Sequence, residues 1–185
     1  DNSREVLFSG AIRSGKTFAL LYKAIISAMN PRARVGLCRH TLTAFRRTTL
    51  KALLEGDGNT PPVLPPGSYV HNETKGEIWL KGGGSIVYFS LEEPDRVRGL
   101  TLSACGVDEV TDLSFADWQL LLGRVNVKID DKPLQLFGVA NPKGSKHWIP
   151  TRFGIIGNTQ HDELATKGCK SYSITAFENP FLSSE

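Results

Sequence analysis

Eight consecutive residues near the start of the chain have the types and spacing needed to hold a polyphosphate. The run reads Gly10-Ala11-Ile12-Arg13-Ser14-Gly15-Lys16-Thr17, which fits the pattern G-x-x-x-x-G-K-T. In this pattern the glycines let backbone N–H groups turn toward phosphate oxygens. The lysine reaches the β- and γ-phosphates, and the threonine hydroxyl contacts Mg²⁺. The run therefore predicts a site for a nucleoside triphosphate, with Thr17 as a ligand of Mg²⁺.

The elements around this run have the order that such a site requires. An apolar run predicts a strand over 5–9, and apolar residues at helical spacing predict a helix over 16–29. A strand, a glycine loop and a helix form the context of a phosphate-binding loop, or Walker A motif, in which the helix N-terminus adds partial positive charge. The alternative is a Gly/Ser-rich turn that matches by chance, and the flanking elements argue against it.

A second candidate site is Asp108-Glu109, which directly follows the apolar run 104–107. An apolar strand that ends in adjacent carboxylates is typical of a Walker B motif. Asp108 is expected to bind the Mg²⁺ that Thr17 also touches, and Glu109 to act as the general base on the attacking water. The alternative is a solvated acidic turn. Because the glutamate follows directly, the pattern favours ATPases with an extra strand between the two motifs.

Two further polar segments are candidates for the same chemistry. Asn141 follows a strand predicted over 134–140 and is placed to sense the γ-phosphate, unless it only begins an Asn-Pro turn. A charged loop over 92–100 carries Arg96 and Arg98. The alternative to a role in this chemistry is that they are solvated, as loop arginines usually are.

Alternating strand and helix patterns predict an α/β fold with a mostly parallel central sheet. The glycine run at 82–84 is expected to turn an antiparallel hairpin. Strands are expected over 5–9, 34–39, 69–72, 77–81, 85–90, 103–108, 134–140 and 170–174, and helices over 16–29, 42–54 and 115–122.

Composition argues against a membrane-spanning, disulfide-rich or strongly basic protein. The chain has 185 residues, with 22 Lys and Arg against 19 Asp and Glu, and a net charge of +3 is too small to indicate nucleic-acid binding alone. Cys38, Cys105 and Cys169 lie in or near apolar runs and are expected to be buried, reduced thiols. No apolar stretch has the length of a membrane span, and no signal peptide is visible. The chain begins without Met, and we expect it to be part of a longer protein.

A basic cluster follows the second predicted strand. Such a cluster could contact the phosphates of duplex DNA, and contacts of this kind would be independent of sequence. The alternative is a solvated basic helix face. The cluster consists of Arg39, His40, Arg46, Arg47 and Lys51.

In their order along the chain, these motifs resemble the N-terminal ATPase domain of the large terminase subunit of tailed bacteriophages. The similarity covers nearly the whole sequence. The segments that carry it are 11–17 with an arginine inside the loop, Arg39-His40-Thr41, 86–89, Arg98-Gly99, 107–109, 140–142 with His147-Trp148, and 178–181.

The resemblance implies a RecA-like P-loop NTPase of the ASCE type that hydrolyses ATP to drive double-stranded DNA into a preformed capsid. It implies that Arg13 lies over the phosphates within its own subunit. It also implies that the segment at Asn141 is a coupling motif, although 140–142 lacks the Ser/Thr-rich sequence of some relatives. By the same resemblance, Arg98 is a candidate arginine finger acting on a neighbouring subunit.

The resemblance further implies a homo-oligomeric ring with portal protein and small terminase subunit as partners, in the host cytoplasm at the procapsid portal. The isolated domain is expected to be a monomer, with residues 1–185 as one ATPase domain. The adenine-contacting segment and the nuclease domain of full-length members are not expected within it. Two alternatives remain: a helicase-like or other RecA-type DNA-dependent ATPase, and a non-hydrolysing nucleotide-binding switch. Glu109 argues against the switch.

Overall fold

Strands that are buried on both faces form the centre of the molecule. The structure is a computed structural model, and it describes residues 2–10, 14–56, 60–141, 147–156 and 159–174. Every residue of β6 (Ala104–Val107) and β7 (Gln135–Ala140) is buried. Continuous buried runs of this kind are typical of parallel strands covered by helices on both sides.

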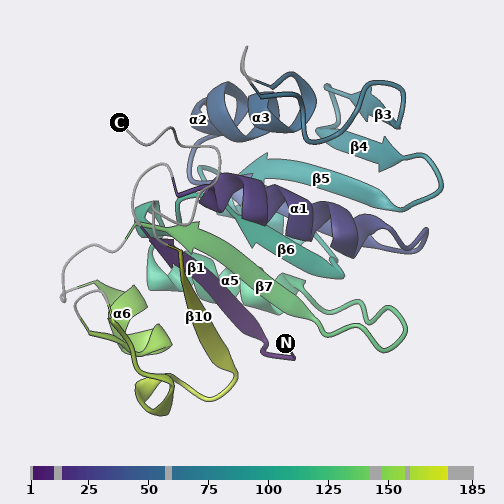
Figure 1. The fold of residues 1–185 in the computed structure, drawn as a ribbon. Coiled ribbons are helices and arrows are strands. Elements are labelled where there is room, and N and C mark those ends of the chain that lie inside the picture. The colour runs from purple at the N-terminus through teal and green to yellow at the C-terminus, as the bar shows by residue number, and fades with distance from the viewer. Residues whose placement is uncertain (1, 11–13, 57–59, 142–146, 157–158, 175–185) are drawn as a thin grey trace, which may run out of the picture.

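Among the described residues, the central sheet has eight strands in the order β10-β1-β7-β6-β2-β5-β4-β3 (Figure 1). The strands from β10 to β5 are parallel to their neighbours, whereas β4 and β3 extend one edge in antiparallel pairing. The remaining strands are β1 (Glu5–Gly10), β2 (Arg34–Arg39), β3 (Tyr69–Asn72), β4 (Glu77–Leu80), β5 (Ser85–Ser90) and β10 (Cys169–Ile174), and a separate ribbon pairs β8 (Ile155–Ile156) with β9 (Thr159–Gln160).

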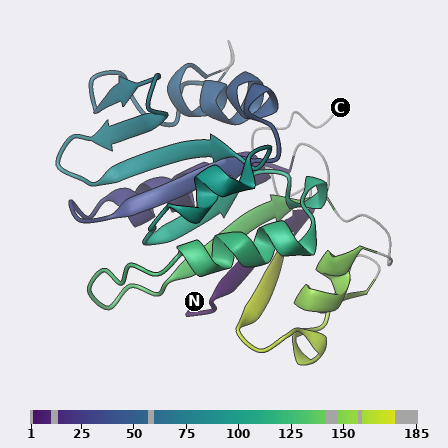
Figure 2. The ribbon, with the colours of Figure 1, turned by 180° about the vertical axis from the view of Figure 1, so that it is seen from behind.

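Helices cover both faces of this sheet. The long helix α1 (Lys16–Ala28) crosses one face, and α5 (Phe115–Arg124) lies on the opposite face, as the view from behind shows (Figures 1 and 2). The short helix α4 packs beside α5. The other helical segments are α2 (Leu42–Phe45), the π-helix η1 (Arg46–Leu50), α3 (Lys51–Leu54), α4 (Pro94–Arg98), the 3₁₀ turn η2 (Val110–Asp112), α6 (Trp148–Phe153) and the 3₁₀ turn η3 (Asp162–Leu164).

Two apolar cores lie on the two sides of the sheet, because successive strand residues point to opposite faces. In β1, Val6 packs in the core that includes α1, and Leu7 packs in the core that includes α5. In β2, Leu37 and Cys38 divide in the same way. Each fully buried valine or leucine side chain stabilises the fold by about 1.5–3 kcal/mol. Apolar packing therefore stabilises the sheet on both faces.

A buried ion pair fixes the amino end of β1. The carboxylate of Glu5, which is 3% exposed, accepts hydrogen bonds from Trp118 Nε1 at 2.7 Å and Arg152 Nε at 2.6 Å. Trp118 belongs to α5 and Arg152 to α6. A buried carboxylate is tolerated only when it is paired and hydrogen-bonded, so this contact holds two helices against the strand.

The structure confirms the predicted α/β class and the predicted strands to within about two residues, and it contradicts two local expectations. The helix expected over 42–54 is interrupted by the π-turn η1. The segment 92–100, expected to be a loop, contains α4, which begins at Pro94 because proline fits the first turn of a helix. The sequence predicted no element for the segments that form α6, β8 and β9.

The thiols follow expectation at two of three positions. Cys38 and Cys105 are buried, whereas Cys169 is half-buried. Burial raises the pKa of the Cys169 thiol to about 12, and the nearby carboxylate of Glu5 acts in the same direction.

Candidate functional site

The candidate residues gather at the carboxyl ends of four adjacent parallel strands. Gly10 ends β1, Arg39 ends β2, Asp108 follows β6 and Asn141 follows β7. The connection from β1 crosses toward β2, whereas the connection from β7 leads to β10 on the other side of β1. Ligands of open α/β sheets bind outside the carboxyl ends at such a reversal of direction.

The lysine of the glycine loop binds other residues of the same loop. Lys16 Nζ donates to the carbonyl oxygen of Gly10 at 3.0 Å and lies 3.2 Å from Ser14 Oγ. Gly15 has φ +82°, in the left-handed region that glycine adopts without strain, and it caps the N-terminus of α1. Burial lowers the pKa of Lys16, and the negative charges of Glu109 and Asp108 oppose this shift.

The predicted nucleotide site also includes Thr17 and three residues of the loop before Ser14. Thr17 follows Lys16 in the first turn of α1 and is half-buried. Ala11, Ile12 and Arg13, which we predicted to contact nucleotide, lie outside the described residues. Their predicted roles remain predictions.

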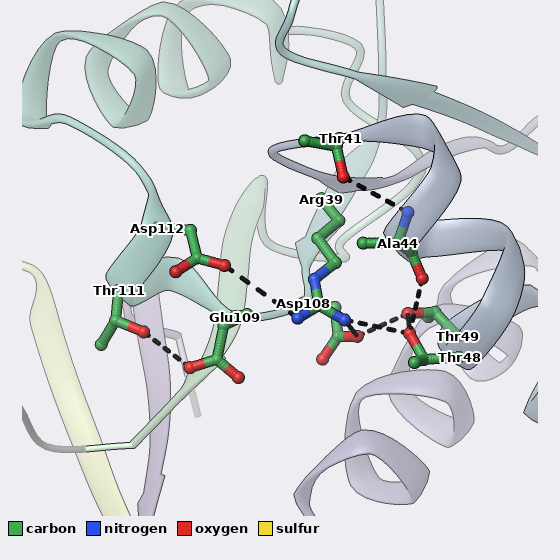
Figure 3. Close-up of polar contacts among 9 residues, drawn as sticks. All are labelled: Arg39, Thr41, Ala44, Thr48, Thr49, Asp108, Glu109, Thr111 and Asp112. Atoms are coloured by element: carbon green, nitrogen blue, oxygen red, sulfur yellow. Dashed lines mark hydrogen bonds and ion pairs between the residues drawn. The ribbon is translucent and has the colours of Figure 1, made fainter.

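Asp108 is buried, and both its backbone and its carboxylate are hydrogen-bonded. It is 5% exposed, its backbone N–H donates to the carbonyl of Cys38 at 2.9 Å, and Thr49 Oγ1 donates to Oδ2 (Figure 3). Burial raises the pKa of Asp108, whereas the Thr49 hydrogen bond and the charge of Arg39 lower it.

Arg39 lies between two carboxylates. Its Nη1 is 3.8 Å from Asp108 Oδ2 and donates to Thr48 Oγ1 at 3.0 Å, and its Nη2 is 4.0 Å from Asp112 Oδ2 (Figure 3). The side chain is 20% exposed. Within the basic cluster of the sequence analysis, Arg39 thus lies beside the carboxylates at the strand ends.

Glu109 adopts an unusual backbone conformation. Its φ is +56°, in a region that non-glycine residues rarely occupy. Its Oε1 accepts a hydrogen bond from Thr111 Oγ1 at 2.6 Å (Figure 3). Strained residues of this kind cluster at functional sites, where the surrounding structure enforces them.

Asn141 carries an unused acceptor at this edge. Its Oδ1 is buried and has no hydrogen-bond partner among the described residues. Leaving such an acceptor unpaired costs about 1–3 kcal/mol, so the position suits a donor that arrives with a ligand or water.

Arg98 lies apart from this edge. It is the last residue of α4, its side chain is 69% exposed, and its Nη1 is 3.2 Å from Asp95 Oδ1. Among the described contacts, none joins Arg98 to the residues at the strand ends. Thus Lys16, Asp108, Glu109 and Asn141 lie at the same edge of the sheet, and no described contact joins Arg98 to them.

Sequence reasoning missed the threonines Thr48, Thr49 and Thr111. A signal for Thr49 exists in the pattern, since Phe45, Thr49 and Leu53 recur every four residues on the buried side of the helix. A polar residue at a position that the pattern expects to be apolar indicates a buried polar partner.

The described residues contain no cluster of three or more His, Cys, Asp or Glu side chains that could hold a metal. Mg²⁺ requires no such cluster, because it binds through one or two protein oxygens with phosphates and water. No helix in the described part of the chain is long and apolar enough to cross a membrane.

The strand order and the loop define a RecA-like P-loop fold in which β7 separates the Walker A strand from the Walker B strand. This arrangement confirms the extra strand that the Asp-Glu pair predicted. The family described as "Terminase large subunit, T4likevirus-type, N-terminal" matches residues 7–154, and the chain belongs to this family.

Solved phage proteins share the fold. The large terminase of a thermophilic bacteriophage in complex with ADP matches with a TM-score of 0.73 and 24% identity, over 98% of this chain and 42% of that chain. The complex of the same terminase with ATP-γ-S matches at 0.72 and 23%, over 98% and 42%. The large terminase ATPase domain of Thermus phage P74-26 matches at 0.63 and 16%, over 94% and 76%. This chain thus spans about two-fifths of the thermophilic-phage terminase that was solved with ADP. No curated protein sequence matches it.

Proposed function

We propose that residues 1–185 form one ATPase domain that hydrolyses ATP to power the translocation of double-stranded viral DNA into a preformed capsid. The observation that carries the proposal is that the Lys16 loop and the Asp108-Glu109 pair lie at the same edge of the sheet, at the carboxyl ends of β1 and β6. Membership of the terminase family supports it. The complexes of the thermophilic-phage terminase with ADP and ATP-γ-S support a nucleotide as ligand.

The described residues fit ATP with Mg²⁺. The buried ammonium of Lys16 lies beside the N-terminus of α1, where negative charge is stabilised. The carboxylate of Asp108 and the hydroxyl of Thr17 would hold the metal. The unpaired Oδ1 of Asn141 would accept a hydrogen bond from the attacking water or its neighbours. Mg²⁺, when bound, would neutralise charge on the β- and γ-phosphates.

In this proposal each side chain has a separate task. Lys16 binds the β- and γ-phosphates, with Arg13 over them within the same subunit. Glu109 takes a proton from the attacking water, a role that contributes about 10²–10⁴ in rate. Asn141 reports the state of the γ-phosphate to the rest of the domain. Arg98 acts on the site of a neighbouring subunit.

The proposal extends to the assembly in which the domain works. We propose a homo-oligomeric ring on the procapsid portal in the host cytoplasm, with portal protein, small terminase subunit and double-stranded DNA as partners. The isolated domain is then a monomer.

The first test compares the wild type with Lys16→Ala. Removing the ammonium should abolish binding at concentrations that saturate the wild type, because charge-assisted hydrogen bonds contribute about 1.5–3 kcal/mol each. A fluorescent ATP analogue measures binding, and phosphate release measures turnover. Lys128→Ala, an exposed lysine before β7, is the control and should behave as wild type. A Lys16→Ala protein that binds normally would contradict the proposal.

A further inference from the structure

The helix after β2 contains a turn that its sequence alone does not explain. Residues Arg46–Leu50 form a π-turn between α2 and α3, and such turns are rare and occur often at functional sites. Within it, Thr48 Oγ1 donates back to the carbonyl of Ala44 at 2.9 Å. The next residue, Thr49, is 0% exposed.

The hydroxyl of Thr49 has one described acceptor outside its own turn, the carboxylate of Asp108. Thr49 Oγ1 lies 2.5 Å from Asp108 Oδ2 (Figure 3). Arg39 approaches the same oxygen at 3.8 Å and binds Thr48, so the π-turn and the end of β2 hold one side of the carboxylate together. Thr49 therefore binds Oδ2 of the carboxylate and does not bind Oδ1.

We infer that Thr49 is a positioning residue, which holds Oδ2 of Asp108 so that the carboxylate is oriented for Mg²⁺. The inference rests on the proposed function. A hydrogen-bond partner that orients a metal-binding side chain changes metal affinity or activity by about 10–100-fold when it is removed. A purely structural threonine would instead alter stability, with equal effects on nucleotide binding in the presence and absence of the metal.

The experiment uses Thr49→Val, which keeps the shape of the side chain and removes the hydroxyl. A fluorescent ATP analogue is titrated in EDTA and over a range of Mg²⁺ concentrations, and hydrolysis is followed separately. Thr49→Val should raise about 10-fold or more the Mg²⁺ concentration that gives the half-maximal change in binding of the ATP analogue. The affinity for the analogue in EDTA should be unchanged. Thr49→Ser should restore the wild-type Mg²⁺ dependence, because it restores the donor.

Thr43→Val is the matched control, since Thr43 is an exposed residue of the same helix. A Thr49→Val protein with the Mg²⁺ dependence of Thr43→Val would overturn the inference. Equal losses of nucleotide affinity with and without Mg²⁺ would also overturn it. Thr49→Ala provides a second measurement if the valine variant does not fold.

The two proposals can fail separately. If the wild type binds the ATP analogue in a Mg²⁺-dependent way and Thr49→Val does the same, only the role of Thr49 is wrong. If the wild type binds no nucleotide, the proposed function and this inference are both wrong. In an Asp108→Asn background, Thr49→Val should change the Mg²⁺ dependence no further, because the two residues act through one contact.

Discussion

Glu109 combines an unusual backbone conformation with a hydrogen-bonded carboxylate. Its φ of +56° turns the chain directly after β6, and the hydroxyl of Thr111 holds one carboxylate oxygen at 2.6 Å. A position of this kind costs about 1–3 kcal/mol and persists only when its surroundings enforce it. The fold therefore maintains this conformation at the end of the strand where we propose the general base.

Replacing Glu109 with Gln should separate binding from hydrolysis. The amide oxygen can still accept from Thr111, so the turn and nucleotide affinity should persist. Hydrolysis should fall about 10²–10⁴-fold, because an amide cannot take a proton from water. Phosphate release alongside titration of a fluorescent ATP analogue measures both quantities.

Asp131→Asn is the control for Glu109→Gln, since it makes the same chemical change in an exposed loop before β7. It should leave both binding and hydrolysis at wild-type values. An active Glu109→Gln enzyme would assign the general base to another group.

At the scale of elements, the helix after β2 has two distinct sides. Thr49 faces Asp108, whereas Arg46 and Arg47 are exposed on the other side. Arg46 lies 3.8 Å from Glu73 at the turn between β3 and β4, in a surface pair whose partners are 46% and 71% exposed. Surface pairs of this kind contribute about 0–1 kcal/mol, so Arg46 can exchange Glu73 for another anion.

Reversing both charges, Arg46→Glu with Arg47→Glu, should weaken binding to duplex DNA without changing affinity for ATP. Each lost contact to phosphate lowers the magnitude of the slope of log K against log salt by about 0.9, so the double variant should lose about 2. A salt titration with duplexes of two unrelated sequences measures this slope, and the loss should be the same for both. The control is Arg32→Glu with Lys128→Glu, exposed residues near the amino ends of the strands. Equal slopes for the two double variants would show that Arg46 and Arg47 make no contact with DNA phosphates.

The ion pair at the start of β1 belongs to the same scale, because it joins a strand to two helices. Arg152→Met leaves the Glu5 carboxylate buried beside Trp118 without its charged partner. Breaking a buried pair in this way costs about 3–5 kcal/mol, and denaturant unfolding should show a loss of that size.

The exposed pair of Arg32 with Asp130 supplies the control for this measurement. Its side chains are 67% and 56% exposed. Asp130→Asn should therefore change the free energy of unfolding by less than about 1 kcal/mol. A similar small change for Arg152→Met would mean that water solvates Glu5 in the folded protein.

Periodicity and motif spacing predicted the elements with strong local signals. The strands at 34–39, 69–72 and 85–90 were predicted at their observed ends, because apolar alternation and glycine turns are local properties. No local pattern of this kind predicted the π-turn, and Asp108, which accepts the hydrogen bond of its Thr49, lies 59 residues away. The carboxylates beside Arg39 likewise come from distant positions. At the end of β6, spacing predicted that Asp108 and Glu109 adjoin the loop, and the partners of each came only from the fold.

For the whole molecule, the position of Arg98 bears on assembly. It ends α4, 69% exposed, and its described ion pair is with Asp95 at 3.2 Å on the same short helix. An ion pair this exposed contributes little to the stability of the fold. Arg98 can therefore exchange Asp95 for an anion that binds it more tightly. None of the described contacts joins Arg98 to Lys16 or Asp108 of its own chain.

An arginine finger from a neighbouring subunit contributes about 10³–10⁵ in rate, because it neutralises charge that develops on the γ-phosphoryl oxygens. The isolated domain should therefore be a slow ATPase whose specific activity rises with protein concentration. In assembled rings, Arg98→Ala should bind ATP and hardly hydrolyse it, and Lys16→Ala should bind none. Mixing the two should restore activity, since an intact site meets an intact finger at about a quarter of the interfaces in a random ring. Phosphate release from mixed rings, with either variant alone as reference, measures this recovery. Mixed rings that remain inactive would show that Arg98 acts within its own subunit or only shapes the end of α4, and Arg96 would be the next residue to test.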